Sequence, residues 1–135
     1  MIHPFFVENN DSEVFNVTCQ RHEGLCWRLL ISGPAGEEAG DLLFEPQDAV
    51  SVRLRDFHIH PEFARKGIGT QVMAHLRIVF REHGFQKAVG ICKSYEYLIA
   101  EKEKLAQWYL KLGFSLIREN KAGIPGYIGK LEMNL

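Results

Sequence analysis

The sequence has few cysteines, almost no net charge and no long apolar segment. Its three cysteines, Cys19, Cys26 and Cys92, are an odd set without the spacing of metal ligands, so we expect neither a disulfide framework nor a metal site. A formal net charge of −1 gives no overall basic field, which argues against nucleic-acid binding. Because no signal sequence or apolar membrane segment is recognised, we expect a soluble, reduced and cytoplasmic protein.

Repeats, linkers and low-complexity tracts are also missing from the sequence. Its 135 residues suit one domain with a real core, and 46% hydrophobic and 24% charged residues are ordinary for a globular protein. We therefore expect a single domain over residues 1–135, without membrane association.

Alternating apolar residues and turn signals predict four short strands before the first helix, near residues 14–20, 25–32, 38–44 and 50–59. After that helix we expect a strand at 87–93, a helix from about Tyr97 to Leu112 with Gly113 as its cap, and strands at 114–118 and 127–133.

The stretch from Val50 to Thr70 places a basic, glycine-containing turn between an apolar strand and an amphipathic helix. The helix is predicted to begin in the turn and to stop at His83, with Gly84 as a left-handed cap. Apolar residues after the turn recur at helical spacing and predict one buried stripe, namely Ile68, Val72, Leu76, Val79 and Phe80.

The turn itself, Arg65-Lys66-Gly67-Ile68-Gly69, predicts an anion site. The first N–H groups of a helix have no intrahelical partner and can bind anionic oxygens. Gly67 and Gly69 remove side chains where a phosphate would approach the backbone, and Arg65 and Lys66 add positive charge. We expect the turn to bind a pyrophosphate.

The strand before the turn changes its alternation partway along. Val52 and Leu54 have one parity, whereas Phe57 and Ile59 have the other. Because side chains alternate with a period of two, the change requires an extra residue, which predicts a β-bulge near Arg55 and Asp56. A bulge leaves backbone groups unpaired beside the phosphate turn, where they can hold a cofactor arm or an oxyanion.

A strand, a bulge and the segment PEFARKGIG, followed later by WYLKLGF, resemble the GNAT superfamily of acyl-CoA-dependent N-acetyltransferases. The family motif Q/R-x-x-G-x-G/A falls on residues 64–69, with both glycines kept and Ala64 at the leading position. The family segment Y-x-K-L-G-F falls on Tyr109 to Phe114. The resemblance covers about residues 50–114 and implies one α/β (α+β) domain, with a mixed, mostly antiparallel sheet.

The resemblance implies acetyl-CoA as co-substrate and direct attack by an amine acceptor. A backbone N–H after the bulge, placed at Phe57, would polarise the thioester carbonyl, and Tyr109 would protonate the departing thiolate. Some relatives use a Glu base where this chain has Arg53, so His58 and His60 become the candidate bases; Glu45, Asp56 and Glu96 remain possible, and a neutral amine needs none. The cofactor-binding residues implied are Phe57, His58, Ile59, Ala64, Arg65, Lys66, Gly67, Ile68, Gly69 and Thr70.

Three departures from the family pattern keep other readings open. The family's N-x-x-A before the tyrosine falls on Lys102 and Leu105, so its Asn is missing, and Ala64 replaces the leading Gln or Arg of the glycine motif. The interval from Val14 to Leu25 is too short for the two helices that commonly shape the family's acceptor pocket. Those helices are either lost or replaced by residues 1–11, which leaves the acceptor site open or completed by another subunit. The alternatives are a non-catalytic acyl-CoA sensor and a partner-binding domain.

The acceptor is expected to be a small-molecule or peptide amine. The final strand, GYIGKLEMNL, suggests a possible homodimer through a free strand edge.

Overall fold

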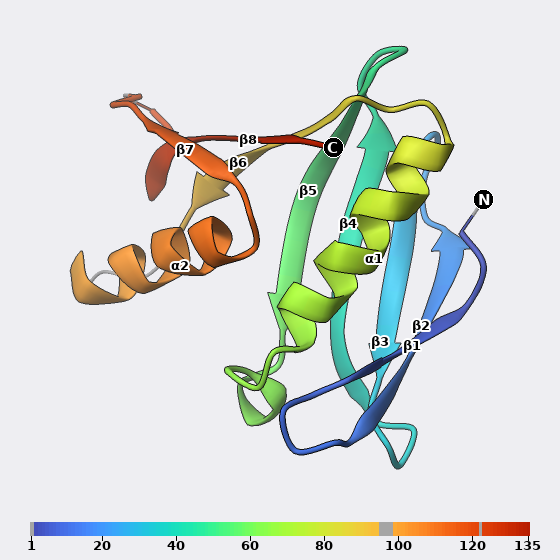
Figure 1. Cartoon of the computed structure of the whole chain (residues 1–135). Coiled ribbons are helices and arrows are strands. Elements are labelled where there is room, and N and C mark those ends of the chain that lie inside the picture. Colours follow the sequence, from blue (N-terminus) through green and yellow to red (C-terminus); the bar gives the residue numbers. More distant parts are fainter. Residues whose placement is uncertain (1, 95–98, 122) are drawn as a thin grey trace.

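The computed structural model describes residues 2–94, 99–121 and 123–135. Within these residues, eight strands form one mixed sheet in the order β1-β2-β3-β4-β5-β6-β8-β7, and two α-helices pack against it (Figure 1). All neighbouring strands in this sheet are antiparallel except β5 and β6. The prediction of a mixed, mostly antiparallel α/β fold is confirmed.

The elements follow the chain in a simple order. The strands are β1 (Phe5–Glu8), β2 (Val14–Arg21), β3 (Trp27–Ser32), β4 (Glu38–Pro46), β5 (Ser51–Ile59), β6 (Lys87–Lys93), β7 (Ser115–Arg118) and β8 (Tyr127–Asn134); the helices are the 3₁₀ turn η1 (Pro61–Phe63), α1 (Ile68–Glu82) and α2 (Ile99–Lys111). The expected start of α2 at Tyr97 lies outside the described residues.

Helix α1 buries one stripe against strands β1 to β5, where the core lies. Ile68, Val72 and Leu76 are each at most 1% exposed, as the helical spacing predicted. Gly84 ends the helix with a φ of 89°. Its N–H donates to the carbonyl oxygen of Arg81 at 3.0 Å, and the N–H of Phe85 donates to the carbonyl oxygen of Phe80. This is the left-handed cap expected from the sequence.

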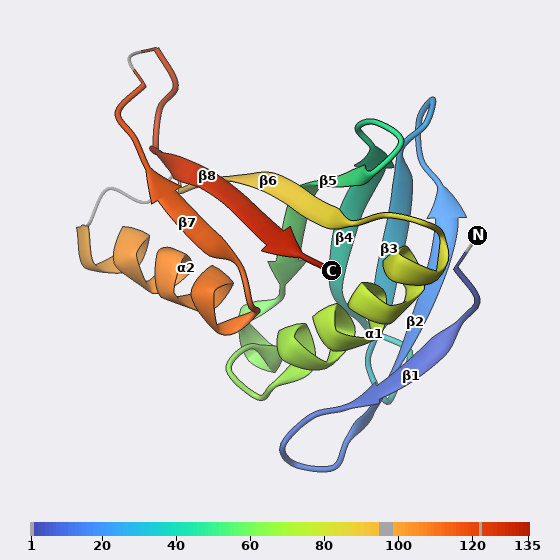
Figure 2. The same cartoon turned by 45° about the horizontal axis from the view of Figure 1, so that its top comes forward.

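Strand β5 contains the predicted bulge. Leu43 of β4 pairs with Asp56, and the next residue, Phe44, pairs with Leu54, so Arg55 is the extra residue. The parallel pairing of β5 with β6 ends at Leu54 and Gly90, although both strands continue. From that point the two strands diverge and divide the sheet into a β1–β5 half, covered by α1, and a β6–β8–β7 half, covered by α2 (Figure 2).

Two expectations about the ends of the sheet are wrong. Five strands precede α1 rather than four, because Phe5–Glu8 pairs with Val14–Val17 as the edge strand β1, without an N-terminal helix. The final strand is not a free edge either, because β8 lies between β6 and β7 and pairs with both. Strand β8 therefore has no free edge through which a dimer could form.

Candidate functional site

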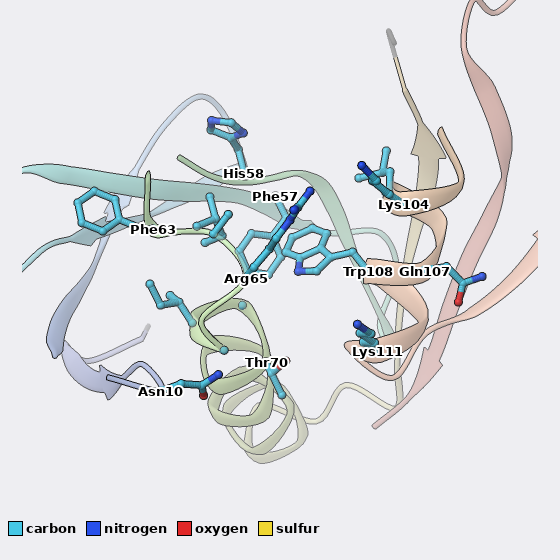
Figure 3. A pocket seen from close by; sticks show the side chains of 16 residues that line it. Asn10, Phe57, His58, Phe63, Arg65, Thr70, Lys104, Gln107, Trp108 and Lys111 are labelled. Atoms are coloured by element: carbon cyan, nitrogen blue, oxygen red, sulfur yellow. The ribbon is translucent and has the colours of Figure 1, made fainter. Parts of the chain in front are cut away.

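A cavity of about 680 Å³ opens where β5 and β6 diverge, between the N-terminus of α1 and one face of α2 (Figure 3). Three segments and one isolated residue form its walls. They are Phe57 to Ile59 at the end of β5; Phe63, Ala64, Arg65, Gly67, Ile68, Gly69 and Thr70 in the turn; Lys104, Leu105, Gln107, Trp108 and Lys111 on α2; and Asn10.

The turn has the backbone shape of an anion site. Gly67 is the N-cap of α1 and has a φ of 86°. No side chain caps the helix there, so its first N–H groups are open to a ligand. Arg65 also has a positive φ, 64°, which is costly for a residue with a Cβ. A strained, positively charged residue and open helix N–H groups thus meet at one wall of the cavity.

Both glycines of the turn are needed for close packing. A Cβ on Gly67 would lie 2.8 Å from Asn10 Oδ1, and a Cβ on Gly69 would lie 2.9 Å from Trp108 Cζ2. The missing side chains therefore let the turn approach both Asn10 and α2, as well as any ligand above the backbone.

The end of β5 directs backbone donors into the cavity. His60 N–H donates to the Ala39 carbonyl oxygen at 2.8 Å, toward β4. Because N–H groups alternate sides along a strand, those of Ile59 and Phe57 point away from β4, toward the side where β6 has diverged. The divergence of β6 thus leaves two backbone donors on the open side of β5.

Helix α2 forms the opposite wall. Lys104, Trp108 and Lys111 are spaced by four and three residues, which places them on one helical face, and all three line the cavity. The Trp108 ring packs edge-on against Phe57, with ring centroids 5.0 Å apart. Two lysines and an indole from α2 thus face the basic turn across the cavity.

Nine of the ten cofactor-binding residues expected from the sequence line this cavity. The exception is Lys66, whose Nζ lies 2.9 Å from Asp11 Oδ2. The side-chain hydrogen bond with Asp11 raises the pKa of Lys66, so Lys66 stays positively charged and paired with Asp11.

The expected catalytic residues are only partly brought together. His58 lines the cavity, whereas His60 does not, and His60 Nε2 lies 4.0 Å from Glu38 Oε1. Tyr109 packs behind the cavity wall, with its ring centroid 5.1 Å from that of Trp108. Burial strongly raises the pKa of Tyr109, and the charges of Cys92 and Asp56 raise it further.

The remaining base candidates are less well placed. Glu45 and Asp56 do not line the cavity, and Glu45 Oε1 lies 4.0 Å from Arg55 Nε. Glu96 lies outside the described residues.

Sequence reasoning missed the α2 wall and the contribution of Asn10. The spacing of Lys104, Leu105, Trp108 and Lys111 was a usable signal, since it placed them on one face, but nothing local indicated that this face was a cavity wall rather than core or solvent. Asn10 gave no signal, because it reaches the turn only through the pairing of β1 with β2.

Within the described part of the chain, no group of three or more His, Cys, Asp or Glu side chains is arranged to hold a metal ion. No helix among the described residues is long and apolar enough to cross a membrane.

Comparison with known proteins places this architecture among acetyltransferases. Residues 22–116 match the family model described as "Acetyltransferase (GNAT) domain". No curated protein sequence matches the chain. Many solved structures share the fold, and three of them illustrate its range.

The first is the GNAT domain of PAT from S. lividans, 12% identical, with a TM-score of 0.74 over 98% of this chain and 97% of that one. The second is a GNAT family acetyltransferase from Elizabethkingia anophelis with acetyl-CoA bound, 16% identical, with a TM-score of 0.60 over 88% and 98%. The third is the PaiA N-acetyltransferase from Thermoplasma acidophilum in complex with coenzyme A, 14% identical, with a TM-score of 0.61 over 82% and 61%. At these identities the likeness is one of fold.

Proposed function

The chain belongs to the acetyltransferase (GNAT) domain family, and from this premise we propose that it transfers the acetyl group of acetyl-CoA directly to an amine acceptor. The observation that carries the proposal is a single cavity that combines the open end of β5, the glycine turn and the basic face of α2. A diphosphate with an extended, amide-containing arm fits that combination of groups. Acetyl-CoA supplies such an arm together with a reactive thioester.

The turn and α2 would hold the cofactor. We assign the pyrophosphate to the first N–H groups of α1, where the helix dipole and the side chain of Arg65 favour negative charge. The pantetheine arm would then run between the end of β5 and Trp108 toward the bulge. The unpaired N–H of Ile59 would donate to one of its amide carbonyl oxygens.

The chemistry requires a polarised carbonyl, a neutral amine and a proton for the leaving thiolate. Phe57 N–H, pointing to the open side of β5, would donate to the carbonyl oxygen as negative charge develops there; one such donor contributes about 3 to 4 kcal/mol. Attack by the amine nitrogen would form the C–N bond and a tetrahedral carbon. The carbonyl double bond would then re-form as the C–S bond breaks and the thiolate leaves.

Tyr109, whose ring packs against Trp108 behind the cavity wall, is proposed from the family resemblance to return the proton to the thiolate sulfur. Its raised pKa keeps the phenol protonated at neutral pH, so the proton is present when the thiolate leaves. For removing the proton of the amine we favour His58 over His60, because only His58 lines the cavity.

The first test is calorimetric titration of the protein with CoA and acetyl-CoA, using a pair of variants on α1. Thr70→Glu places a carboxylate in the cavity yet suits a helix N-terminus, so the fold should survive. Gln71→Glu makes the same charge change on the adjacent exposed residue, which does not line the cavity.

We expect micromolar binding to the wild type and to Gln71→Glu, and binding at least about tenfold weaker to Thr70→Glu, because a like charge facing the phosphate opposes it. Absence of binding to the wild type at millimolar CoA would overturn the proposal. Turnover is then measured as release of free CoA thiol with amine acceptors. Tyr109→Phe should lower kcat while CoA affinity stays unchanged.

A second function, binding of acyl-CoA without turnover, is favoured by one observation. Leu105 lines the cavity at the position where the family motif usually has Ala, and the larger leucine side chain would take up space there. CoA binding with no thiol release for lysine, polyamine or peptide amines would support this sensor function over catalysis.

A further inference from the structure

The turn that joins β1 to β2, residues 9–13, is bonded directly to the phosphate turn. Asn10 N–H donates to the Lys66 carbonyl oxygen at 2.7 Å. The next residue of the turn contacts the same lysine, because Asp11 Oδ2 lies 2.9 Å from Lys66 Nζ. A backbone bond and an ion pair therefore connect the same two segments, which are more than fifty residues apart in the sequence.

The β1–β2 turn is itself held in a fixed shape. Asn9 is buried, 7% exposed, and its Oδ1 accepts hydrogen bonds from Asp11 N–H at 3.0 Å and Glu13 N–H at 2.9 Å. Its Nδ2 donates to Glu13 Oε1 at 3.0 Å. These bonds satisfy a buried amide and fix the backbone on which Asn10 and Asp11 stand.

Asn10 brings a polar side chain to the cavity. Its carboxamide lines the wall beside the first turn of α1 (Figure 3), and its Oδ1 is 2.8 Å from the position that a Cβ on Gly67 would occupy. An amide there adds two N–H donors next to the open helix N–H groups. The Nδ2 atom lies 3.8 Å from the same position, so an amide donor from the β1–β2 turn stands beside the helix N-terminus.

We propose that the β1–β2 turn is a wall of the phosphate site, in which Asn10 Nδ2 donates to a phosphate oxygen of CoA and the Asp11–Lys66 pair holds the Lys66–Gly67 peptide in place. The inference rests on the proposed function, since it takes CoA as the ligand. Lys66 is then a positioning residue, because its charge is paired with Asp11 and its side chain is outside the cavity. Because the turn is already fixed before binding, less conformational entropy is lost when the ligand binds.

The first experiment compares Asn10→Ala and Asn10→Asp for binding of CoA and of pantetheine, which lacks the phosphates. Pantetheine is followed by its displacement of bound acetyl-CoA. Both variants keep the backbone N–H that bonds Lys66. We expect Asn10→Ala to weaken CoA about tenfold, as for a hydrogen bond to a charged group, Asn10→Asp to weaken it more, and pantetheine affinity to be unchanged.

The exposed Asn120, in the loop between β7 and β8, provides the matched control. Asn120→Ala should bind both ligands as the wild type does. Equal losses for CoA and pantetheine in Asn10→Ala would overturn the proposal, because they would indicate general damage rather than a phosphate contact.

The Asp11–Lys66 pair is tested with Asp11→Asn and Lys66→Met. Each should weaken CoA several-fold but not pantetheine, and the double variant should lose no more than either single one, because both act through one interaction. Lys66→Arg can keep the ion pair, so its affinity for CoA should equal that of the wild type.

Wild-type CoA affinity in Asn10→Ala and in the Asp11 and Lys66 variants would overturn this inference and leave the proposed function intact. A wild type that does not bind CoA would overturn both.

Discussion

The indole of Trp108 lies against Gly69, so that a Cβ on residue 69 would come within 2.9 Å of indole Cζ2. This contact joins the N-terminus of α1 to α2 across the cavity, and through the ring pair with Phe57 it also reaches β5. Three walls of the proposed cofactor site therefore meet at one side chain.

Gly69→Ala should force the Trp108 ring to move. We expect a loss of about 1 to 2 kcal/mol in the free energy of unfolding, because overpacking outweighs the better helix propensity of alanine. The loss is measured by urea denaturation, and the ring movement by Trp fluorescence in a Trp27→Phe background. In a Trp108→Leu background the same Gly69→Ala change should be neutral or stabilising. An equal loss in both backgrounds would contradict the contact.

Arg65 combines charge with backbone strain at a φ of 64°. Arg65→Gly should raise the free energy of unfolding by about 1 kcal/mol because glycine adopts this conformation freely. It should also weaken CoA binding through loss of the charge. Arg65→Ala should weaken binding similarly without gaining stability, and Arg65→Lys should keep binding. Equal stabilities of the Gly and Ala variants would show that the strain is not stored there.

The bulge at Arg55 can be removed without changing which side chains are buried. Leu54 and Phe57 are both buried, whereas Arg55 and Asp56 are both exposed, so deletion of Arg55 leaves a regular in-out alternation. We expect the deletion variant to fold with similar stability but to lose CoA affinity by more than about tenfold, because the strand end changes its pairing. Arg55→Ala, which keeps the extra residue, should bind normally. Unchanged binding by the deletion variant would contradict the role given to the bulge.

Burial raises the pKa of the Cys92 thiol from 9.0 to about 11. The folded protein therefore holds this proton more tightly than the unfolded chain. The resulting stability, on the order of 2 kcal/mol, is fully present below the unfolded pKa and is lost as pH rises toward the folded one. Urea midpoints measured between about pH 8 and about pH 11 should fall less steeply for Cys92→Ala than for the wild type. Parallel pH profiles would contradict the shift.

Several features of the fold could be predicted because their signals are local. The stripe on α1 and the cap at Gly84 lie within one helix, and the parity change between Leu54 and Phe57 requires an extra residue wherever the strand pairs. Each signal depends on side-chain spacing, which tertiary structure does not alter.

Other features depend on pairing between distant segments and had no local signal. The four residues of β1 become a strand only because Val14–Val17 lies beside them. The side chain of Lys66 is turned from the cavity by Asp11, which reaches it through that same pairing. Predicting which residues line the cavity therefore requires the topology of the fold, even where the residue types indicate the chemistry.

The position of β8 between β6 and β7 also bears on how the molecule folds. Strands β1 to β5 pair in sequence order through short connections, so they can form early and at little entropic cost. Strand β7 pairs only with β8, and β6 pairs with β5 over only four residues, from Lys87 to Gly90, so the pairing of this half of the sheet is completed only by β8, which follows both in the chain. We expect hydrogen exchange during refolding to show early protection in β2–β5 and late protection in β6 and β8. The two walls of the cofactor cavity would then form at different times. Only chains in which both walls have folded would bind the ligand.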